Sequence, residues 1–379
     1  MKIALLGLGT VGKAVFDILQ DKELPFLKRN QIDVSYVLVR NVHNKTINPE
    51  LLVTDYNRIL EDSTIEVIIE MMGATVSYEY IKLALASSKH VITANKEVIA
   101  KHYMELQNIA LQHHVNLLFE ASVGGGMPIV HTLLSGTSFN RIEKIEGILN
   151  GTTNFILTSM HQEKISFEEA LKLAQKQGFA EADPTADLEG LDMVRKIAIL
   201  SMIAYHSPID LEKIEHHGIG NVTKEIIEIL DLLDYKLKFI ATSQLKNEKV
   251  SIIVEPVVLK KTDLLATVNY EYNLVCYEGD VCAKQMMYGK GAGQATAHSI
   301  LFDLELLLSG YQQQFSPTKN IIYRKKNEIY ASYILKTKTN LKRKYIEKHL
   351  GDLVITKPIT REELDSLKNE IEFYARLEV

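Results

Sequence analysis

The sequence has few cysteines, a small net charge and no long apolar run, and each of these shortages excludes a class of protein. Its two cysteines, Cys276 and Cys282, give neither a disulfide framework nor a zinc pattern, which suits a reducing cytosol. A net charge of −5 and a pI near 6.2 argue against a nucleic-acid surface. No apolar run approaches the ~18–20 residues that span a bilayer, and no basic leader precedes the first apolar segment. We therefore expect a cytoplasmic protein without a membrane or nucleic-acid partner.

The length and composition predict two or three globular domains. The chain has 379 residues, of which 46% are hydrophobic and 24% charged, values typical of globular proteins. The overall prediction is an α/β fold. Residues 1–130, completed by 291–311, are expected to form a Rossmann-type dinucleotide-binding domain with a parallel sheet. Residues 131–290 are expected to form an α+β domain for substrate binding and dimerisation, and residues 318–379 a small α+β module.

The first region alternates short apolar segments with amphipathic ones. Strands are predicted at KIALLGLG, DVSYVLVR, IEVIIEMMG, HVITANK and NLLFEASVGGG, and helices at VGKAVFDILQ and YIKLALASSK. Strands and helices that alternate at this spacing are typical of βαβ units and a parallel sheet.

The later regions show a different pattern. RIEKIEGIL and VSIIVEPVVL are predicted as strands exposed on one face, SFEEALKLAQKQ and MVRKIAILSMIAY as helices, and GAGQATAHSILFDLELLLSGY as a glycine-rich turn followed by a helix. In the C-terminal module we expect the order strand, helix, strand, helix, strand. Its segments are EIYASYILKTKT, LKRKYIEKHLG, DLVIT, TREELDSLKNEI (with Thr360 as N-cap) and FYARLEV.

Three glycines after the first strand form a G-x-G-x-x-G pattern. Gly7 permits a tight turn, Gly9 lets the backbone approach a pyrophosphate, and Gly12 allows close packing of helix and strand. The pattern alone is also compatible with an ordinary turn, but its position between a strand and a helix favours dinucleotide binding. After the second strand, Arg40 stands where an acidic residue would bind the ribose of NAD, and Lys45 is nearby. A cation there suits the 2′-phosphate, so we expect NADP, with NAD as the alternative.

Two further segments carry polar residues at strand ends. Lys96 follows a strand of the predicted parallel sheet, at the edge where ligands bind in such folds, although a lysine there can also be an exposed loop residue. Glu120 precedes Gly124, Gly125 and Gly126. One carboxylate with inward-turned carbonyls can hold a hard cation, and a flexible interdomain loop explains the glycines equally well.

The segment NGTTN and the acidic segment 178–196 supply further candidates. Asn150, Gly151 and Thr152 can bind a ligand or cap the next helix. The acidic segment fails the EF-hand spacing and contains Pro184. Asp192 and Lys196 are four residues apart on a predicted apolar helix and therefore share a face. They either line a cleft, where desolvation lowers the pKa of the lysine and suits it to proton transfer, or form a weak surface pair.

Together these motifs resemble the homoserine dehydrogenase family over roughly residues 1–310. The segment GILNGTTNFILTSM, followed by GFAEADPTADLEGLD and RK, is similar to the signature of that family, and VITANKE and EASVGGGMPI are similar to two other blocks. The resemblance implies a monofunctional NAD(P)-dependent oxidoreductase that interconverts L-homoserine and L-aspartate 4-semialdehyde in threonine and methionine biosynthesis. It also implies a homodimer or higher homo-oligomer. The C-terminal module is expected to be a reduced form of the family's ACT-type regulatory domain, one strand short.

The resemblance also assigns roles to residues. Lys196 is the implied acid/base, oriented by Asp192, and Lys96 is expected between nicotinamide and substrate. Substrate binding is expected at Glu181, Asp187, Asp192, Asn150, Gly151 and Thr152. Cofactor binding is expected at Gly7, Gly9, Thr10, Val11, Gly12, Arg40, Gly73, Lys96 and Gly178. A monovalent cation such as sodium is expected at Glu120, Val123, Gly125 and Met127. The alternatives are a dehydrogenase of another small hydroxy-amino acid and a silent NADP-sensing protein.

Overall fold

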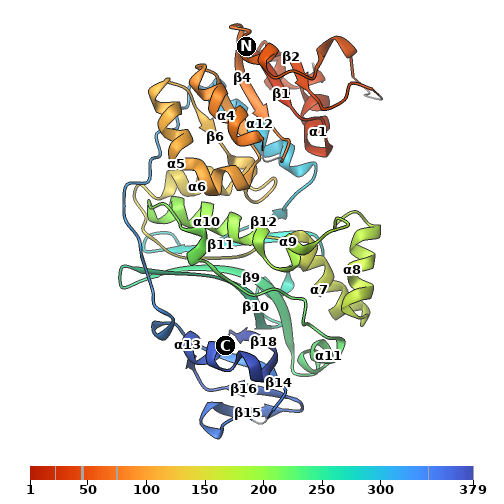
Figure 1. The fold of residues 1–379 in the computed structure, drawn as a ribbon, viewed down its shortest axis with the longest axis vertical. Helices are drawn as coiled ribbons and strands as arrows, with labels where there is room; N and C mark the ends of the chain where they lie inside the picture. The colour runs from red at the N-terminus through yellow and green to blue at the C-terminus, as the bar shows by residue number, and fades with distance from the viewer. Residues whose placement is uncertain (22, 44–46, 74–75, 340, 379) are drawn as a thin grey trace. The chain divides into compact units, whose positions relative to one another are not determined.

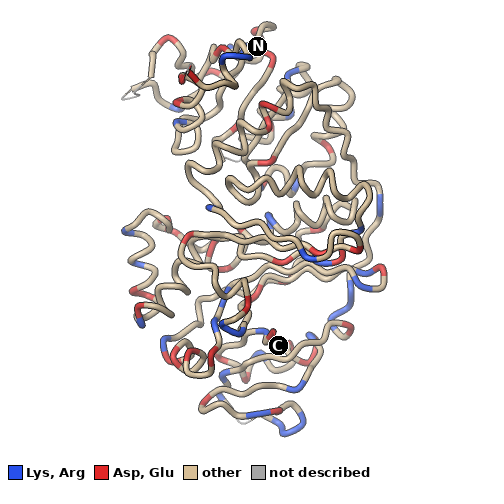
Figure 2. The backbone as a smooth tube through the Cα atoms, turned by 180° about the vertical axis from the view of Figure 1, so that it is seen from behind, with Lys and Arg blue, Asp and Glu red and all other residues tan. Residues whose placement is uncertain are grey.

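The computed structural model describes residues 1–21, 23–43, 47–73, 76–339 and 341–378. It divides into two compact units (Figure 1). Unit 1 comprises residues 1–138, 202–208 and 290–319, and unit 2 comprises residues 139–201, 209–289 and 320–379. No helix among the described residues is long and apolar enough to cross a bilayer. Lys and Arg are interspersed with Asp and Glu along both units (Figure 2).

Unit 1 contains a parallel sheet with the strand order β3-β2-β1-β4-β5-β6. Its strands are β1 (Lys2–Leu6), β2 (Asp33–Leu38), β3 (Leu52–Val53), β4 (Ile65–Glu70), β5 (His90–Thr93) and β6 (Leu117–Leu118). The order reverses between β1 and β4, and doubly wound sheets bind their ligands at such a switch point. The predicted Rossmann-type α/β fold is confirmed.

Helices pack on both faces of this sheet because successive residues of its strands, which point to opposite faces, are apolar and buried. Helices α1 (Thr10–Gln20) and α12 (Ala295–Leu308) share one core with Ile3 and Leu5 of β1. Helices α4 (Ser77–Ala86) and α5 (Lys96–Gln112) lie side by side (Figure 1). The smaller helices are α2 (Pro25–Arg29), α3 (Asn57–Leu60) and α6 (Ile129–Gly136). Helix α12 therefore joins unit 1 although it lies far along the chain.

Unit 2 contains a large mixed sheet with the order β12-β11-β7-β9-β10-β18-β14-β16-β15. Its longer strands are β7 (Ile142–Ile148), β9 (Tyr235–Lys246), β10 (Lys249–Lys260), β11 (Tyr272–Gly279) and β12 (Ala283–Lys290). Asn247 and Glu248 join β9 to β10 with positive φ at both positions, as the twist of a two-residue hairpin requires. The helices are α7 (Gly151–Glu163), α8 (Phe167–Lys176), α9 (Thr185–Leu188), α10 (Leu191–Tyr205) and α11 (Lys224–Leu232). The expectation that β10 is exposed on one face is wrong, because residues 252–259 are buried on both faces.

The C-terminal part of unit 2 continues the same sheet. It comprises β14 (Tyr330–Thr337), β15 (Ile346–Leu350), β16 (Leu353–Thr356), α13 (Arg361–Ser366) and β18 (Ile371–Leu377), with the short strands β8 (Glu215–His216), β13 (Ile322–Tyr323) and β17 (Ile359–Thr360) alongside. Strand β18 pairs in parallel with β10 and antiparallel with β14. Buried Arg361 donates to Glu255 of β10 (2.6 Å) and to Glu215 (2.9 Å). The module is therefore joined to the sheet by backbone pairing and by buried charge.

One predicted element of this module is wrong. The sequence predicts a helix over residues 341–351, but the segment forms a 3-10 turn at Arg343–Tyr345 and then β15. Strand β15 pairs antiparallel with β16 through a tight turn in which Gly351 has φ +59°. This pairing overrides a local preference for helix, which is weak in so short a segment. Compared with a βαββαβ unit, the described module therefore lacks the first helix and not a strand.

Candidate active site

The glycine turn after β1 has the geometry that a bound pyrophosphate needs. Gly7 has φ +103°, and a Cβ on Gly12 would lie 2.3 Å from the carbonyl oxygen of Gly7, so turn and helix pack without room for a side chain. A Cβ on Gly9 would meet nothing within 4 Å. Helix α1 begins at Thr10 and Val11 with no side-chain cap and no acidic residue in its first turn. Its N–H groups are thus available to an anion.

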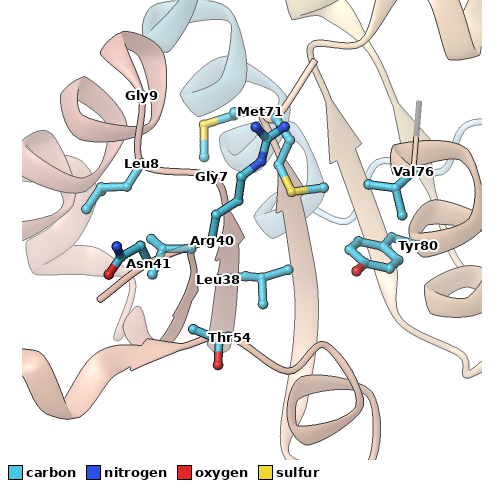
Figure 3. Close-up of a pocket in the computed structure, with 12 residues that line it drawn as sticks. Gly7, Leu8, Gly9, Leu38, Arg40, Asn41, Thr54, Met71, Val76 and Tyr80 are labelled. Carbon is cyan, nitrogen blue, oxygen red and sulfur yellow. The ribbon is translucent and has the colours of Figure 1, made fainter. Parts of the chain in front are cut away.

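A groove of about 520 Å³ opens beside this turn (Figure 3). It is lined by Gly7, Leu8, Gly9, Leu38, Val39, Arg40, Asn41, Thr54, Met71, Met72, Val76 and Tyr80. Arg40 is an exposed cation at the end of β2, as the sequence predicted. Lys45 lies outside the described residues. Gly73, with φ +62°, directly follows the lining residue Met72.

Lys96 is the first residue of α5 and is half-buried. Its position is fixed by Asn95, whose side chain accepts the N–H of Val98 (3.1 Å) and so caps the helix. Strand β5 ends at Thr93, so Lys96 lies at the carboxyl edge of the parallel sheet.

The loop proposed for a cation is built around buried Glu120. Its two carboxylate oxygens accept the N–H groups of Val130 (2.8 Å) and His131 (2.7 Å), at the start of α6. Burial, helped by the nearby charge of Asp303, raises the pKa of Glu120 to about 7. The carbonyl of Gly125 accepts the hydroxyl of Ser299 (2.5 Å), and that of Met127 accepts the N–H of Ile129 (2.8 Å). Among the described residues, no group of three or more His, Cys, Asp or Glu side chains could hold a metal ion.

Unit 2 brings four of the predicted residues together. Lys196 Nζ donates to Asp192 Oδ2 (2.7 Å) and to the carbonyl of Leu149 (2.6 Å). Asn150 Nδ2 donates to Asp192 Oδ2 (2.9 Å) and to Asp187 Oδ1 (2.7 Å). The side chains of Asp192 and Lys196 are 8% and 10% exposed, so they are not a solvated surface pair.

The surroundings of Asp187 favour the protonated form of its carboxyl group. Burial raises its pKa, and the nearby charge of Asp192 adds to the increase, while the amide of Asn150 opposes it. A lysine, an amide and two carboxylates therefore share one small polar cluster. Such a cluster can hold a hydroxyl or ammonium group and can exchange a proton with it.

Among the other predicted residues, Thr152 borders this cluster, since its side chain helps to oppose the rise in the pKa of Asp187. Gly151 begins α7, and Thr152 donates its hydroxyl to the carbonyl of Phe179 (2.5 Å). Gly178, with φ +80°, ends α8 in a Schellman turn: its own N–H reaches Gln175, and that of Phe179 reaches Ala174. Glu181 is exposed.

Sequence reasoning missed two contributors. The carbonyl of Leu149 that holds Lys196 belongs to the backbone, and no residue type announces such a role. Buried Glu70, at the end of β4, accepts three hydrogen bonds beside the groove. In the sequence, Glu70 could have been noticed as the carboxylate that ends the otherwise apolar run VIIE.

Comparison with known proteins agrees with this geometry. Residues 7–120 match the model of the homoserine dehydrogenase NAD-binding domain, and residues 128–304 match the model of homoserine dehydrogenase. The chain is 41% identical over 311 residues to homoserine dehydrogenase of Bacillus subtilis, covering 80% of this chain and 72% of that protein.

Solved structures cover the whole chain. A homoserine dehydrogenase from Thiobacillus denitrificans superposes with a TM-score of 0.91 at 28% identity, covering 100% of this chain and 98% of that one. The enzyme from S. aureus at pH 7.5 gives a TM-score of 0.79 at 32% identity, with coverage of 100% and 98%. The C-terminal module is thus part of the shared architecture.

Proposed function

The chain belongs to the homoserine dehydrogenase family, as an NAD(P)-dependent oxidoreductase acting on a CH–OH group, and from this premise we propose that Lys196 moves the proton of the reaction. The substrates of this activity are L-homoserine and L-aspartate 4-semialdehyde. The observation that carries the proposal is the buried contact of 2.7 Å between Lys196 Nζ and Asp192 Oδ2.

The nicotinamide dinucleotide, when bound, supplies hydride transfer to and from the terminal carbon of the substrate. As a neutral amine Lys196 takes the hydroxyl proton during oxidation, and as an ammonium group it gives a proton to the developing alkoxide during reduction. Asp192 and the Leu149 carbonyl aim the ammonium group, and Asn150 holds Asp192 in place. Since all four groups are fixed by α10 and by the β7–α7 turn, little reorganisation accompanies the proton transfer.

Further roles follow from the positions of the remaining residues. We assign substrate contacts to Glu181, Asp187 and Thr152, with Gly151 beside them. Cofactor contacts are assigned to the glycine turn (Gly7, Gly9, Thr10, Val11 and Gly12), to Gly73 and to Gly178. Lys96 is proposed to stabilise the oxyanion electrostatically. Lys96 belongs to unit 1 and Lys196 to unit 2.

An activity assay tests the function directly. Homoserine oxidation is followed at 340 nm with NAD and NADP in parallel, and the reverse reaction is followed with aspartate semialdehyde. Serine and threonine serve as comparison substrates. Turnover of either comparison substrate at the rate of homoserine would contradict the substrate assignment.

We propose NADP as the preferred cofactor because Arg40 lines the groove at the end of β2. A guanidinium binds a phosphate through charge-assisted hydrogen bonds, whereas the ribose hydroxyl of NAD is better bound by a carboxylate. The groove offers Asn41 beside Arg40, and this pair supports the same choice.

We propose that a monovalent cation, sodium in the first instance, binds the loop of Glu120, Val123, Gly125 and Met127. Each carboxylate oxygen of Glu120 and each carbonyl oxygen of Gly125 and Met127 accepts one donor, which leaves lone pairs for an ion. Thermal denaturation in sodium chloride and in choline chloride tests this. Sodium is expected to raise the melting temperature of the wild type and not that of Glu120→Gln. An equal effect of choline would exclude a specific site.

We also propose a homodimer formed through strand β12. This strand ends the sheet, and its exposed positions include Met286 (39%) and Tyr288 (58%). Val281 (67%) precedes the strand, and Phe139 (73%) is next to Asn140, which accepts the N–H of Val281. An edge strand with exposed apolar side chains favours pairing with another strand. If two copies pair antiparallel about Met286 and Met287, Lys284 lies opposite Gly289 and no like charges meet.

Sedimentation equilibrium tests this interface. The wild type is expected as a dimer, and Gln285→Pro combined with Met286→Lys is expected to shift it toward monomer. The control is Lys172→Glu, a charge change on the exposed face of α8. A proline control such as Lys172→Pro with Leu173→Lys would break α8 and is therefore unsuitable. A dimer that survives the β12 changes unaltered would place the interface elsewhere.

A further inference from the structure

Glu70 is a buried carboxylate at the carboxyl end of β4. It is 0% exposed and follows the apolar run Val67, Ile68 and Ile69. Burial of a charge costs several kcal/mol unless hydrogen bonds compensate for the lost water. The groups that donate to its two oxygens therefore show what this carboxylate holds in place.

One oxygen of Glu70 holds the wall of the dinucleotide groove. Oε1 accepts the N–H of Met72 (2.8 Å) and the hydroxyl of Ser77 (2.7 Å). Met72 lines the groove, and Ser77 is the first residue of α4, the helix that supplies the lining residue Tyr80. The side chain of Met72 also packs against the glycine turn, because a Cβ on Gly7 would lie only 3.2 Å from Met72 Cγ. This oxygen thus fixes the groove wall against the glycine turn.

The other oxygen holds the turn that leads to Lys96. Oε2 accepts the hydroxyl of Thr93 (2.6 Å), and the Thr93 oxygen in turn accepts the N–H of Asn95 (3.0 Å). Asn95 caps α5 through Val98, and Lys96 is the first residue of that helix. The backbone carbonyl of Glu70 adds a bond from the N–H of Ala94 (3.1 Å). The chain of contacts runs from Glu70 to Lys96 within one rigid turn.

We propose that Glu70 is a positioning residue that ties the groove wall to the Lys96 turn, so that dinucleotide binding and the placement of Lys96 depend on one carboxylate. The inference rests on the proposed roles of the groove and of Lys96. A carboxylate suits this task because it accepts on both oxygens at once, whereas an amide accepts on only one. Glu70 touches neither substrate nor cofactor in this assignment and acts through its neighbours.

Three variants separate the two arms. Ser77→Ala is expected to raise the Kd for NADPH roughly tenfold and to leave kcat unchanged, the loss typical of one hydrogen bond to a charged group. Thr93→Val is expected to lower kcat roughly tenfold and to leave the Kd unchanged. Glu70→Gln is expected to affect both parameters. In the double variant Glu70→Gln with Thr93→Val, the loss of kcat is expected to be smaller than the two single losses combined. The Kd is measured by NADPH fluorescence on folded protein, without turnover.

Glu66→Gln is the matched control, since Glu66 lies on the same strand with a side chain 53% exposed. It is expected to match the wild type. The proposal is overturned if Glu70→Gln changes Kd and kcat by less than twofold, or if Ser77→Ala and Thr93→Val affect the same parameter. It is equally overturned if the variants have lower melting temperatures and if their Kd and kcat return to wild-type values when the assay is cooled. That pattern would mark a structural role only. The assignment of Lys96 fails separately if Lys96→Ala shows full turnover. In that case Glu70→Gln would still weaken NADPH binding.

Discussion

Lys196 and Asp192 face each other across one turn of α10, with 2.7 Å between Nζ and Oδ2 and both side chains almost fully buried. An exposed pair at this spacing would contribute little. Here the pair is held on both sides, by the Leu149 carbonyl and by Asn150, so its geometry does not depend on solvent.

The first prediction concerns Lys196 itself. Lys196→Ala is expected to lower kcat by about 10²–10⁴-fold, since general acid–base catalysis contributes that much, and to leave the Kd for NADPH unchanged. Steady-state kinetics and fluorescence titration measure the two quantities. Lys172→Ala, on the exposed side of α8, is the control. Near-normal turnover by Lys196→Ala would exclude it as the proton carrier.

Asn150→Asp tests the amide that separates two carboxylates. It would place a third negative charge beside Asp187 and Asp192, where burial already raises the pKa of Asp187. We expect kcat/KM to fall at least tenfold at pH 8 and to recover in part at lower pH, as a proton neutralises the added charge. The exposed Asn221→Asp serves as control. A pH-independent effect of Asn150→Asp would show that charge is not the cause.

Arg40→Ala tests cofactor choice. It is expected to raise KM for NADP by about tenfold or more, the loss typical of a hydrogen bond to a charged group, and to leave KM for NAD nearly unchanged. Arg58→Ala, a substitution of an exposed arginine in the same unit, should alter neither. Equal losses with both dinucleotides would mean that Arg40 does not contact the 2′-phosphate.

His161 predicts a pH dependence of stability. Burial lowers its pKa to about 4, and both ring nitrogens are engaged, with Nε2 accepting the N–H of Leu237 (2.9 Å) and Nδ1 beside Asp231 (3.1 Å). Between pH 6.5 and about 4 the unfolded chain holds a proton here that the folded chain does not. The free energy of unfolding is therefore expected to fall by up to about 1.4 kcal/mol per pH unit as the pH drops through this window.

Urea denaturation from pH 7.5 to 4.5 measures this slope. His161→Gln keeps an acceptor for Leu237 and is expected to be less stable at pH 7.5 but to show a shallower decline. The exposed His114→Gln should follow the wild type. Parallel curves for wild type and His161→Gln would contradict the assignment.

Arg361→Met tests the attachment of the C-terminal module. It leaves Glu255 buried with one partner fewer, and removing one member of a buried ion pair costs about 3–5 kcal/mol. We expect a corresponding loss in the free energy of unfolding and earlier proteolysis of residues 320–378. Arg343→Met, in the exposed turn before β15, is the control. A double change of Arg361→Met with Glu255→Gln should recover part of the loss.

Much of the fold could be predicted from sequence because the signals were local. The G-x-G-x-x-G turn, the apolar alternation of residues 1–130 and the Thr360 cap each depend on a few neighbouring residues, and the structure contains all three. The i,i+4 spacing likewise predicted that Asp192 and Lys196 meet, because helix geometry alone brings them together.

The remaining features depended on contacts between distant segments. β15 became a strand because β16 pairs with it, and residues 252–259 of β10 are buried on both faces by neighbours that are distant in the chain. Burial decided that Asp192 and Lys196 are not a surface pair, and the fold supplied the Leu149 carbonyl and the bridging amide of Asn150. The sequence determined which chemical groups are present and which lie on one helix face. The tertiary structure decided which of them lose water and gain partners, because desolvation and hydrogen bonding depend on residues far apart in the chain.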